Sequence, residues 1–265
     1  MKPAPFEYNA PRSLDEALAL LDDEAKVLAG GQSLVPLLNF RLARPTRIVD
    51  ANGIGELDHL RRSGGVLKIG AMTRQATLER SRLIAEHWPL LRQAVKLVGH
   101  TQIRARGTVG GSVAHADPTA ELPTALTALD ARFHVRSTRG ARTLSADELF
   151  VGPLTTTLEP DELIVEIDVP PLPEGAGTAF VEHAKTHGDF ALAGAAAVVA
   201  PGRSASIALL GAGPKPIRAP RAEQALVEGA SAREAGAIAA AEVEDDYRAA
   251  LTAELVRRAV EWATP

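Results

Sequence analysis

The run Thr108-Val109-Gly110-Gly111-Ser112-Val113-Ala114-His115-Ala116-Asp117 places two adjacent glycines after an apolar residue, with hydroxyl side chains on either side. An upstream segment, Ala29-Gly30-Gly31-Gln32-Ser33-Leu34, has the same character. Adjacent glycines allow positive φ and let the backbone approach a ligand with no Cβ in between. Successive N–H groups in such turns bind anions, phosphates in particular. The two segments together predict two loops that close on one extended, phosphate-bearing ligand, although each alone also fits an ordinary tight turn.

Composition limits the classes of function. The chain has 265 residues, enough for one large domain or two modest ones, and 46% hydrophobic residues, as in globular proteins. The net charge of −4 gives no basic field for nucleic acid. Cysteine is absent, which excludes disulfides, a thiol nucleophile, and any zinc site or iron–sulfur cluster held by thiolates of this chain.

The hydropathy pattern bears on location. Residues 1–8 lack the apolar run of a signal peptide. No segment approaches the ~20 uninterrupted apolar residues of a membrane span, and residues 192–200 are apolar but short enough for a buried strand. We therefore expect a cytoplasmic protein with no transmembrane segment.

The first part of the chain alternates strands and helices. Short strands are expected at residues 6–8, 26–29 and 47–50. Ser13 and Glu16 form the pattern of a capping box at the start of a helix. A second helix is expected over residues 33–42, directly after Gly30-Gly31. This order predicts a compact α/β unit over about residues 1–54.

The chain from residue 55 onward has a different pattern. Strands are expected at residues 66–70 and 163–169, and residues 112–116 alternate after the second glycine pair. In the strand at 163–169, alternation places Leu163, Val165, Ile167 and Val169 on one face. Thr138-Arg139-Gly140 indicates a hairpin between residues 132–137 and 141–144. Helices are expected over residues 73–82, 89–98 and 122–129.

A proline-rich stretch, Pro170-Pro171-Leu172-Pro173-Glu174-Gly175, marks the clearest domain boundary. We expect one domain over residues 1–170, with subdomains of about 1–54 and 55–170, and a second over 171–265. The second should contain three antiparallel strands at residues 178–184, 194–200 and 204–210. Three alanine-rich helices should follow, over residues 221–227, 232–241 and 246–263.

The order of several short motifs resembles one family nearly from end to end. These motifs are the Ala-Gly-Gly-x-Ser-Leu loop at 29–34, Ile-Gly-Ala-x-Thr at 69–73, Gln-Ile-Arg-x-Arg-Gly-Thr-Val-Gly-Gly-Ser at 102–112, Leu-x-Pro-x-Glu-Leu-Ile at 158–164 and Lys-x-x-x-Asp-aromatic-Ala at 185–191. Each motif alone is weak, but their order and spacing together are specific. The chain resembles the flavin-binding medium subunits of molybdenum hydroxylases, such as carbon monoxide dehydrogenase and xanthine dehydrogenase.

The resemblance implies an α+β fold and FAD as cofactor. The fold would be a two-subdomain FAD-binding domain of the vanillyl-alcohol-oxidase (PCMH) type, followed by a small C-terminal domain with a three-stranded antiparallel sheet and helices. The FAD would lie extended between the two subdomains. The C-terminal domain would close near the isoalloxazine ring.

The resemblance also implies the residues that bind FAD. One side of the pyrophosphate would be held by Leu28, Ala29, Gly30, Gly31, Gln32, Ser33 and Leu34, and the other by the backbone N–H groups and hydroxyls of Thr108, Gly110, Gly111 and Ser112. Farther along the cofactor would lie Ala114, His115, Asp117, Glu121, Leu163, Lys185 and Phe190. Among these, Glu121 would hydrogen-bond adenosine or ribityl hydroxyls, and Phe190 would cover one ring face where relatives commonly have Tyr. No catalytic residue and no metal ligand is expected on this chain.

Some of these residues allow a second interpretation. His115 could carry a proton near the flavin or pack beside it as a hydrogen-bonding group. Asp117 and Glu121 could form an acid–base pair or position a loop. Arg104 and Arg106 could bind phosphate or lie at the surface. A metal at His183, His187 and Asp189 has no supporting ligand cluster.

The resemblance implies a role in electron transfer. Electrons would come from a large molybdopterin subunit through [2Fe–2S] clusters on a small subunit to FAD, and leave to NAD, a quinone or oxygen. The chain alone should not hydroxylate a substrate. Two alternatives stay open: a stand-alone FAD-dependent oxidoreductase, and an assembly subunit that has lost the cofactor. The substrate, the acceptor, the stoichiometry and whether the isolated subunit retains FAD do not follow from the sequence.

Overall fold

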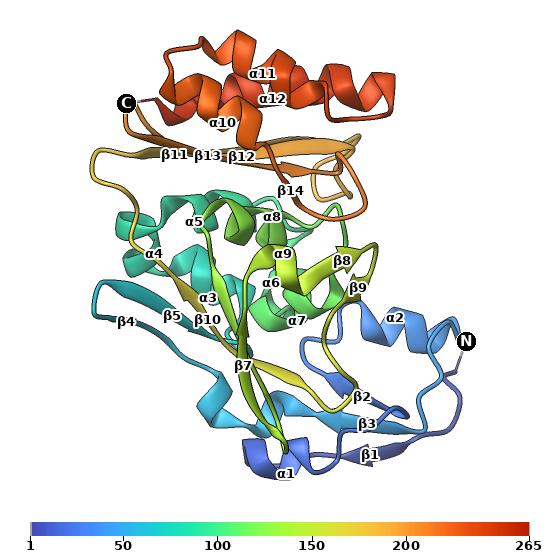
Figure 1. The fold of residues 1–265 in the computed structure, drawn as a ribbon. Coiled ribbons are helices and arrows are strands. Elements are labelled where there is room, and N and C mark those ends of the chain that lie inside the picture. The colour runs from blue at the N-terminus through green and yellow to red at the C-terminus, as the bar shows by residue number, and fades with distance from the viewer. Residues whose placement is uncertain (1, 265) are drawn as a thin grey trace.

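The N-terminal part of the chain forms a small parallel sheet. The computed structural model describes residues 2–264. Strands pair in the order β1 (Glu7–Asn9), β3 (Arg47–Asp50) and β2 (Ala25–Leu28), with α1 (Leu14–Leu18) and α2 (Leu34–Asn39) in the connections (Figure 1). This confirms the expected order of strands and helices.

The capping box expected at α1 forms only in part. Ser13 Oγ accepts a hydrogen bond from the Glu16 N–H at 3.3 Å, as an N-cap should. The Glu16 carboxylate, however, accepts from the Arg12 N–H at 2.8 Å instead of from Ser13. Complete capping boxes form at Ser145 and Ser231.

A five-stranded antiparallel sheet follows. Its strands lie in the order β4 (Leu60–Ser63), β5 (Val66–Gly70), β10 (Leu163–Val169), β6 (Arg132–Ser137) and β7 (Gly140–Leu144). The hairpin β6–β7 is the expected one, whereas β4, with charged residues at Arg61 and Arg62, was not expected. After β7 come α9 (Ala146–Leu149) and a small hairpin of β8 (Phe150–Gly152) and β9 (Thr155–Thr156).

The expected facing of β10 is wrong because the strand carries a bulge. Its pairing with β6 shifts between Ile164 and Glu166, and a bulge moves later side chains to the other face. Ile167 and Val169 therefore enter the main core, whereas Leu163 and Val165 pack against the cluster beneath the N-terminal sheet.

Six short helices cover one face of the five-stranded sheet. They are α3 (Gln75–Arg80), α4 (Arg82–His87), α5 (Pro89–Val95), α6 (Thr101–Arg106), α7 (Val109–His115) and α8 (Glu121–Ala128). Helix α7 replaces the turn and alternating segment expected around Gly110-Gly111. Thr108 caps the helix by accepting from the Gly111 N–H at 3.1 Å, and Ala116 ends it with a left-handed φ of 50°.

The C-terminal part forms a second antiparallel sheet, with four strands rather than three. The order is β11 (Gly177–His183), β12 (Ala193–Ala200), β13 (Ser204–Leu210) and β14 (Ile217–Arg218). The fourth strand lies between Pro216 and Pro220, where no strand was expected. It escaped detection because two residues are too few to show alternation.

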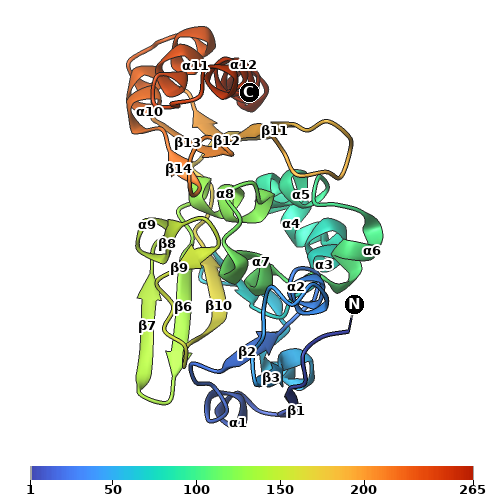
Figure 2. The same cartoon turned by 90° about the vertical axis from the view of Figure 1, so that its right-hand side faces the viewer.

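The C-terminal sheet lies between two layers of helices (Figures 1 and 2). One face packs on α10 (Pro220–Val227), α11 (Ala232–Ala240) and α12 (Asp246–Ala263). Phe180, Ala196, Val198, Ala208 and Leu210 face the other way and share the main core with α5 and α8. Within residues 2–264 no helix is both long enough and apolar enough to cross a membrane.

Candidate functional site

The two glycine segments lie against each other in the structure. A Cβ on Gly30 would sit 2.4 Å from the carbonyl oxygen of Arg106 and 2.7 Å from Cα of Gly107. A Cβ on Gly111 would sit 3.5 Å from Cβ of Ala29. Real Cβ atoms do not tolerate the first two distances, so only glycine at position 30 allows this approach. The fold thus brings Ala29–Gly30 and Arg106–Gly111 together from sites almost 80 residues apart in sequence.

The glycines of the second segment are used for packing. A Cβ on Gly110 would lie 2.5 Å from Cβ of Ala71, at the end of β5. The Gly110 N–H donates to the Ala71 carbonyl at 2.8 Å, and the Gly111 N–H to Thr108 Oγ1 at 3.1 Å. These two N–H groups therefore already have acceptors within the protein.

The first segment, in contrast, offers free donors. Gly31 has a φ of +74°, which turns the backbone at this point. Across the part of the chain that the structure describes, the N–H groups of Gly31, Gln32 and Ser33 have no protein acceptor. Gln32 is held by a hydrogen bond from its Nε2 to the Gly30 carbonyl at 3.0 Å. Consecutive unpaired N–H groups around a positive φ form the kind of concavity that accepts an anion.

The other expected site residues fall into three places. Ser112, Ala114 and His115 lie on α7, and Leu163 packs against the same hydrophobic cluster as Val27 and Ala29 of the first part of the chain. Asp117 and Glu121 flank the turn from α7 into α8. Lys185 and Phe190 lie in the loop between β11 and β12, and Phe190 is 77% exposed.

The loop between β11 and β12 reaches α6 at the end away from the glycine contact. A Cβ on Gly188 would lie 2.7 Å from Cε1 of His100, which precedes α6, whereas Gly30 meets the other end of this helix at Arg106. Six helical residues span about 9 Å. Gly188, two residues before Phe190, therefore lies at the start of α6, whereas Gly30 lies at its end. Within residues 2–264, no hydrogen bond joins Lys185 to either glycine segment.

The turn between α7 and α8 connects the two sheets. Asp117 Oδ1 accepts from the Thr119 N–H at 2.8 Å and from its hydroxyl at 2.7 Å. The Pro118 carbonyl accepts from the Gly211 N–H at 3.0 Å, at the end of β13. This turn therefore contacts the C-terminal sheet directly.

Two half-buried carboxyl groups, those of Glu121 and Glu182, lie near this turn. Burial, together with the smaller repulsion from the charges of Glu182 and Asp117, raises the pKa of Glu121 to about 8. Burial also raises the pKa of Glu182, on β11, to about 7. The buried Glu182 Oε2 has no hydrogen-bond partner among the described residues.

Three residues near these sites were not expected from the sequence: Glu182, Asn52 and Arg74. Glu182 lies two residues after Phe180 and so on the same, inner face of β11. A carboxyl group on an apolar face is unusual, and this could have marked Glu182 as a candidate from the sequence. Asn52 contacts Ala29 in the first glycine segment, and Arg74 contacts the Arg106 carbonyl just before the second, but neither belongs to a glycine motif. Their roles depend on contacts made across the fold.

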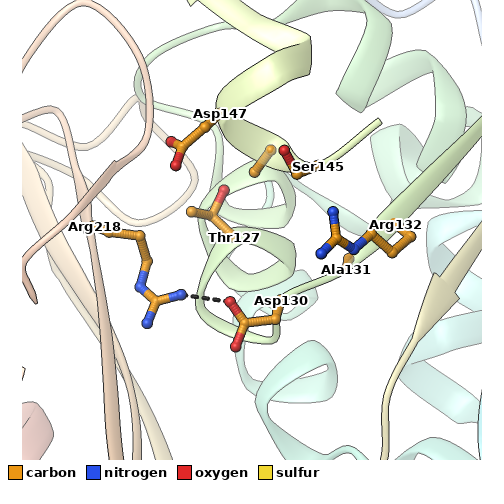
Figure 3. Close-up of a pocket in the computed structure, with 8 residues that line it drawn as sticks. Thr127, Asp130, Ala131, Arg132, Ser145, Asp147 and Arg218 are labelled. Atoms are coloured by element: carbon orange, nitrogen blue, oxygen red, sulfur yellow. Dashed lines mark hydrogen bonds and ion pairs between the residues drawn. The ribbon is translucent and has the colours of Figure 1, made fainter. Parts of the chain in front are cut away.

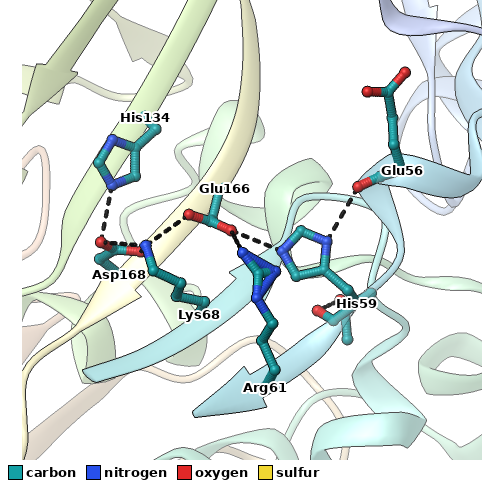
Figure 4. A network of polar contacts seen from close by, with 8 residues as sticks. Glu56, His59, Arg61, Lys68, His134, Glu166 and Asp168 are labelled. Carbon is teal, nitrogen blue, oxygen red and sulfur yellow. Dashed lines mark hydrogen bonds and ion pairs between the residues drawn. The ribbon is translucent and has the colours of Figure 1, made fainter. Parts of the chain in front are cut away.

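A separate polar network lies on the open face of the five-stranded sheet (Figure 4). Lys68 Nζ lies 2.9 Å from Glu166 Oε1 and 2.9 Å from Asp168 Oδ1. His134, Glu166 and Asp168 are close enough together to share a metal ion. The Lys68 ammonium already lies between the two carboxylates, and their hydrogen bonds raise its pKa. A cation of the chain itself thus supplies the positive charge there.

A small cavity beside Arg218 does not suit a large ligand (Figure 3). It has a volume of about 70 Å³ and is lined by Thr127, Asp130, Ala131, Arg132, Ser145, Ala146, Asp147 and Arg218. Arg218 spans it to Asp130 at 2.6 Å. Since a water occupies about 30 Å³ in the liquid, this cavity holds a few waters at most.

Comparison with known proteins shows the family to which the chain belongs. Residues 4–172 match the family described as the FAD-binding domain in molybdopterin dehydrogenase. The chain is 46% identical to the alpha subunit of the 6-hydroxypseudooxynicotine dehydrogenase complex of Paenarthrobacter nicotinovorans, over 86% of this chain and 80% of that one. It is 39% identical to the carbon monoxide dehydrogenase medium chain of Hydrogenophaga pseudoflava, over 99% of both.

A solved structure shows the same fold. Carbon monoxide dehydrogenase from Hydrogenophaga pseudoflava, in a form lacking the Mo-pyranopterin moiety, superposes with a TM-score of 0.94 at 39% identity over 99% of this chain and 98% of that one. The family match covers most of the chain, including both glycine segments. The chain therefore belongs to the family of FAD-binding domains of molybdopterin dehydrogenases, which are components of oxidoreductases that bind FAD.

Proposed function

We propose that this chain binds FAD in an extended pose between its two glycine segments and transfers electrons within a molybdenum-containing dehydrogenase. The observation that carries the proposal is the contact of Gly30 with Arg106–Gly107, beside three N–H groups that have no protein acceptor. A dinucleotide pyrophosphate has the negative charge that such donors accept. When bound, FAD supplies the redox centre, and the protein positions it.

The proposed division of roles follows the geometry. The N–H groups of Gly31, Gln32 and Ser33 bind the pyrophosphate, and Leu28, Ala29, Gly30 and Leu34 shape that loop. The second segment keeps the loop in place, with Gly110 packed on Ala71 and Gly111 close to Ala29, while the hydroxyls of Thr108 and Ser112 complete the pocket. Toward the flavin end we propose Ala114, His115, Asp117, Glu121, Leu163, Lys185 and Phe190.

We also propose the domain division and location expected from the sequence. An FAD-binding unit would cover residues 1–170, with subdomains of about 1–54 and 55–170, and a C-terminal unit residues 171–265. The family match ends at residue 172, close to that boundary. A cytoplasmic location suits the absence of cysteine.

The proposed partners are the other subunits of such a complex. Relatives are named as a medium chain or as one subunit of a dehydrogenase complex. This chain has no cysteine to hold an iron–sulfur cluster. We propose that a small subunit with [2Fe–2S] clusters delivers electrons from a large molybdopterin subunit, and that FAD passes them to NAD, a quinone or oxygen.

The test is the visible spectrum of the purified chain, before and after addition of FAD, with the released cofactor identified. We expect a yellow protein that releases FAD, or a colourless one that takes up one FAD per chain. Hydroxylation of an aldehyde or N-heterocycle by the pure FAD-loaded chain would contradict the proposed role as a subunit. No uptake of FAD, alone or with an iron–sulfur partner, would contradict cofactor binding itself.

A further inference from the structure

A polar side chain bridges the first glycine segment to the rest of the fold. Asn52 follows β3 in a short 3₁₀ turn (Ala51–Gly53). Its Nδ2 donates to the Ala29 carbonyl at 2.9 Å and to Asp50 Oδ1 at 2.5 Å. Its Oδ1 accepts from Arg74 Nη2 at 2.6 Å. Both donors and the acceptor of the amide are thus engaged, which fixes the orientation of the side chain.

Arg74 continues the bridge to the second glycine segment. Its Nη1 donates to the Arg106 carbonyl at 2.5 Å. That carbonyl oxygen is the atom against which Gly30 packs. The Arg74 backbone also pairs with Thr108, the cap of α7. A continuous chain of contacts therefore runs from Ala29 through Asn52 and Arg74 to Arg106.

We infer that Asn52 and Arg74 are positioning residues that hold the two glycine segments at a fixed separation and so set the affinity for the pyrophosphate of FAD. This inference rests on the proposed function for the identity of the ligand. The physical basis is preorganisation: a guanidinium fork reads two acceptors in a rigid plane. If the two segments already have their final relative position before binding, FAD binding does not incur the entropy cost of ordering them. Neither side chain needs to touch the cofactor.

The test compares three variants of the full chain. Asn52→Ala removes the amide, Arg74→Met keeps the apolar stem without the fork, and Arg74→Lys keeps the charge with a single donor site. The matched control is Arg80→Met, because Arg80 is exposed on α3 and makes no ion pair within residues 2–264. FAD affinity is measured by quenching of flavin fluorescence.

We expect Asn52→Ala and Arg74→Met each to weaken FAD binding about tenfold, as for loss of one charge-assisted hydrogen bond. Arg74→Lys should recover only part of the affinity, and Arg80→Met should bind as the wild type does. The double variant should lose little more than either single variant, since both break one bridge. Wild-type affinity in the single variants, or fully additive losses, would overturn the inference.

A second measurement does not depend on FAD. Hydrogen exchange of the Gly110 and Gly111 amides, which donate to Ala71 and Thr108, is followed in the FAD-free protein. We expect faster exchange in Asn52→Ala and Arg74→Met than in the wild type and Arg80→Met. Unchanged exchange would overturn the bridge even if FAD binds. Faster exchange in the two variants, together with a wild type that binds no FAD, would instead keep the bridge and reject the proposed ligand.

Discussion

At the scale of single residues, the approach of the two segments depends on the missing side chain of Gly30. An alanine there would place its Cβ 2.4 Å from the Arg106 carbonyl oxygen and 2.7 Å from Gly107 Cα. Both are backbone atoms, which cannot rotate away as a side chain can. We expect Gly30→Ala to lower the free energy of unfolding by about 1–3 kcal/mol, as overpacking does. FAD affinity should fall at least about tenfold, because the segments must separate for the substitution to fit.

The control for this prediction is Gly55→Ala. A Cβ on Gly55 would meet nothing within 4 Å, and its φ is not positive. Urea denaturation and FAD titration of both variants are the measurements. Equal stability and equal FAD affinity for Gly30→Ala and the wild type would show that the segments do not depend on this contact.

Single residues were predictable where the chemistry lies within a few neighbours in sequence. Adjacent glycines beside hydroxyl residues are visible in one window, and one glycine of each pair, Gly30 and Gly111, lies at the contact. Asn52 and Arg74 were missed because an amide and a guanidinium have no local signature. Their partners lie 23 and 32 residues away. The sequence also could not show that the N–H groups of Gly110 and Gly111 are used by Ala71 and Thr108.

At the scale of elements, α7 is stabilised by its cap. Thr108 is buried, and its Oγ1 accepts from the Gly111 N–H at 3.1 Å. Removing the hydroxyl leaves that N–H unpaired at the start of a helix that already contains two glycines. We expect Thr108→Val to lower the free energy of unfolding by about 0.5–2 kcal/mol, and Thr108→Ser to recover most of the loss. Urea denaturation of the two variants is the measurement, and equal losses in both would contradict a capping role.

The same cap explains why the element around the second glycine pair was predicted wrongly. Two glycines and alternating small residues favour a turn and a strand by local propensity. Val109 and Val113 instead lie four residues apart on one helical face, and both are fully buried. The bulge in β10 had a similar effect, because no residue type in that strand marks a change of register. Tertiary packing decided both elements.

At the scale of the whole molecule, the order of layers was predictable but the contacts between them were not. Proline clusters and strand patterns separated the chain into its sheets. One face of the second sheet shares a core with the helices under the first sheet, through Phe180, Ala196 and Leu210. The apolar character of these residues predicts burial but does not show which element they pack against. The meeting of Glu121 with Glu182 is a consequence of that packing.

This meeting predicts a pH dependence of stability. Burial raises the pKa of Glu121 from 4.5 to about 8 in the folded chain, with added repulsion from Glu182 and Asp117. The folded state therefore binds the proton more tightly than the unfolded state does. The stability that protonated Glu121 contributes to the folded state is fully present below about pH 4.5 and is lost as the pH rises toward 8. At 1.36 kcal/mol per pKa unit, the loss is at most about 5 kcal/mol.

Glu121→Gln keeps a neutral group of the same shape in place at every pH. We therefore expect this variant of the FAD-free chain to be more stable than the wild type at pH 8 and no more stable at pH 5, by urea denaturation at both values. The control is Glu242→Gln, since Glu242 is exposed and makes no ion pair within the described chain; it should follow the wild type at both pH values. If the wild type and Glu121→Gln lose stability equally between pH 5 and pH 8, then Glu121 is ionised in the folded protein without penalty. In that case Glu121 would not be the cause of a pH-dependent stability.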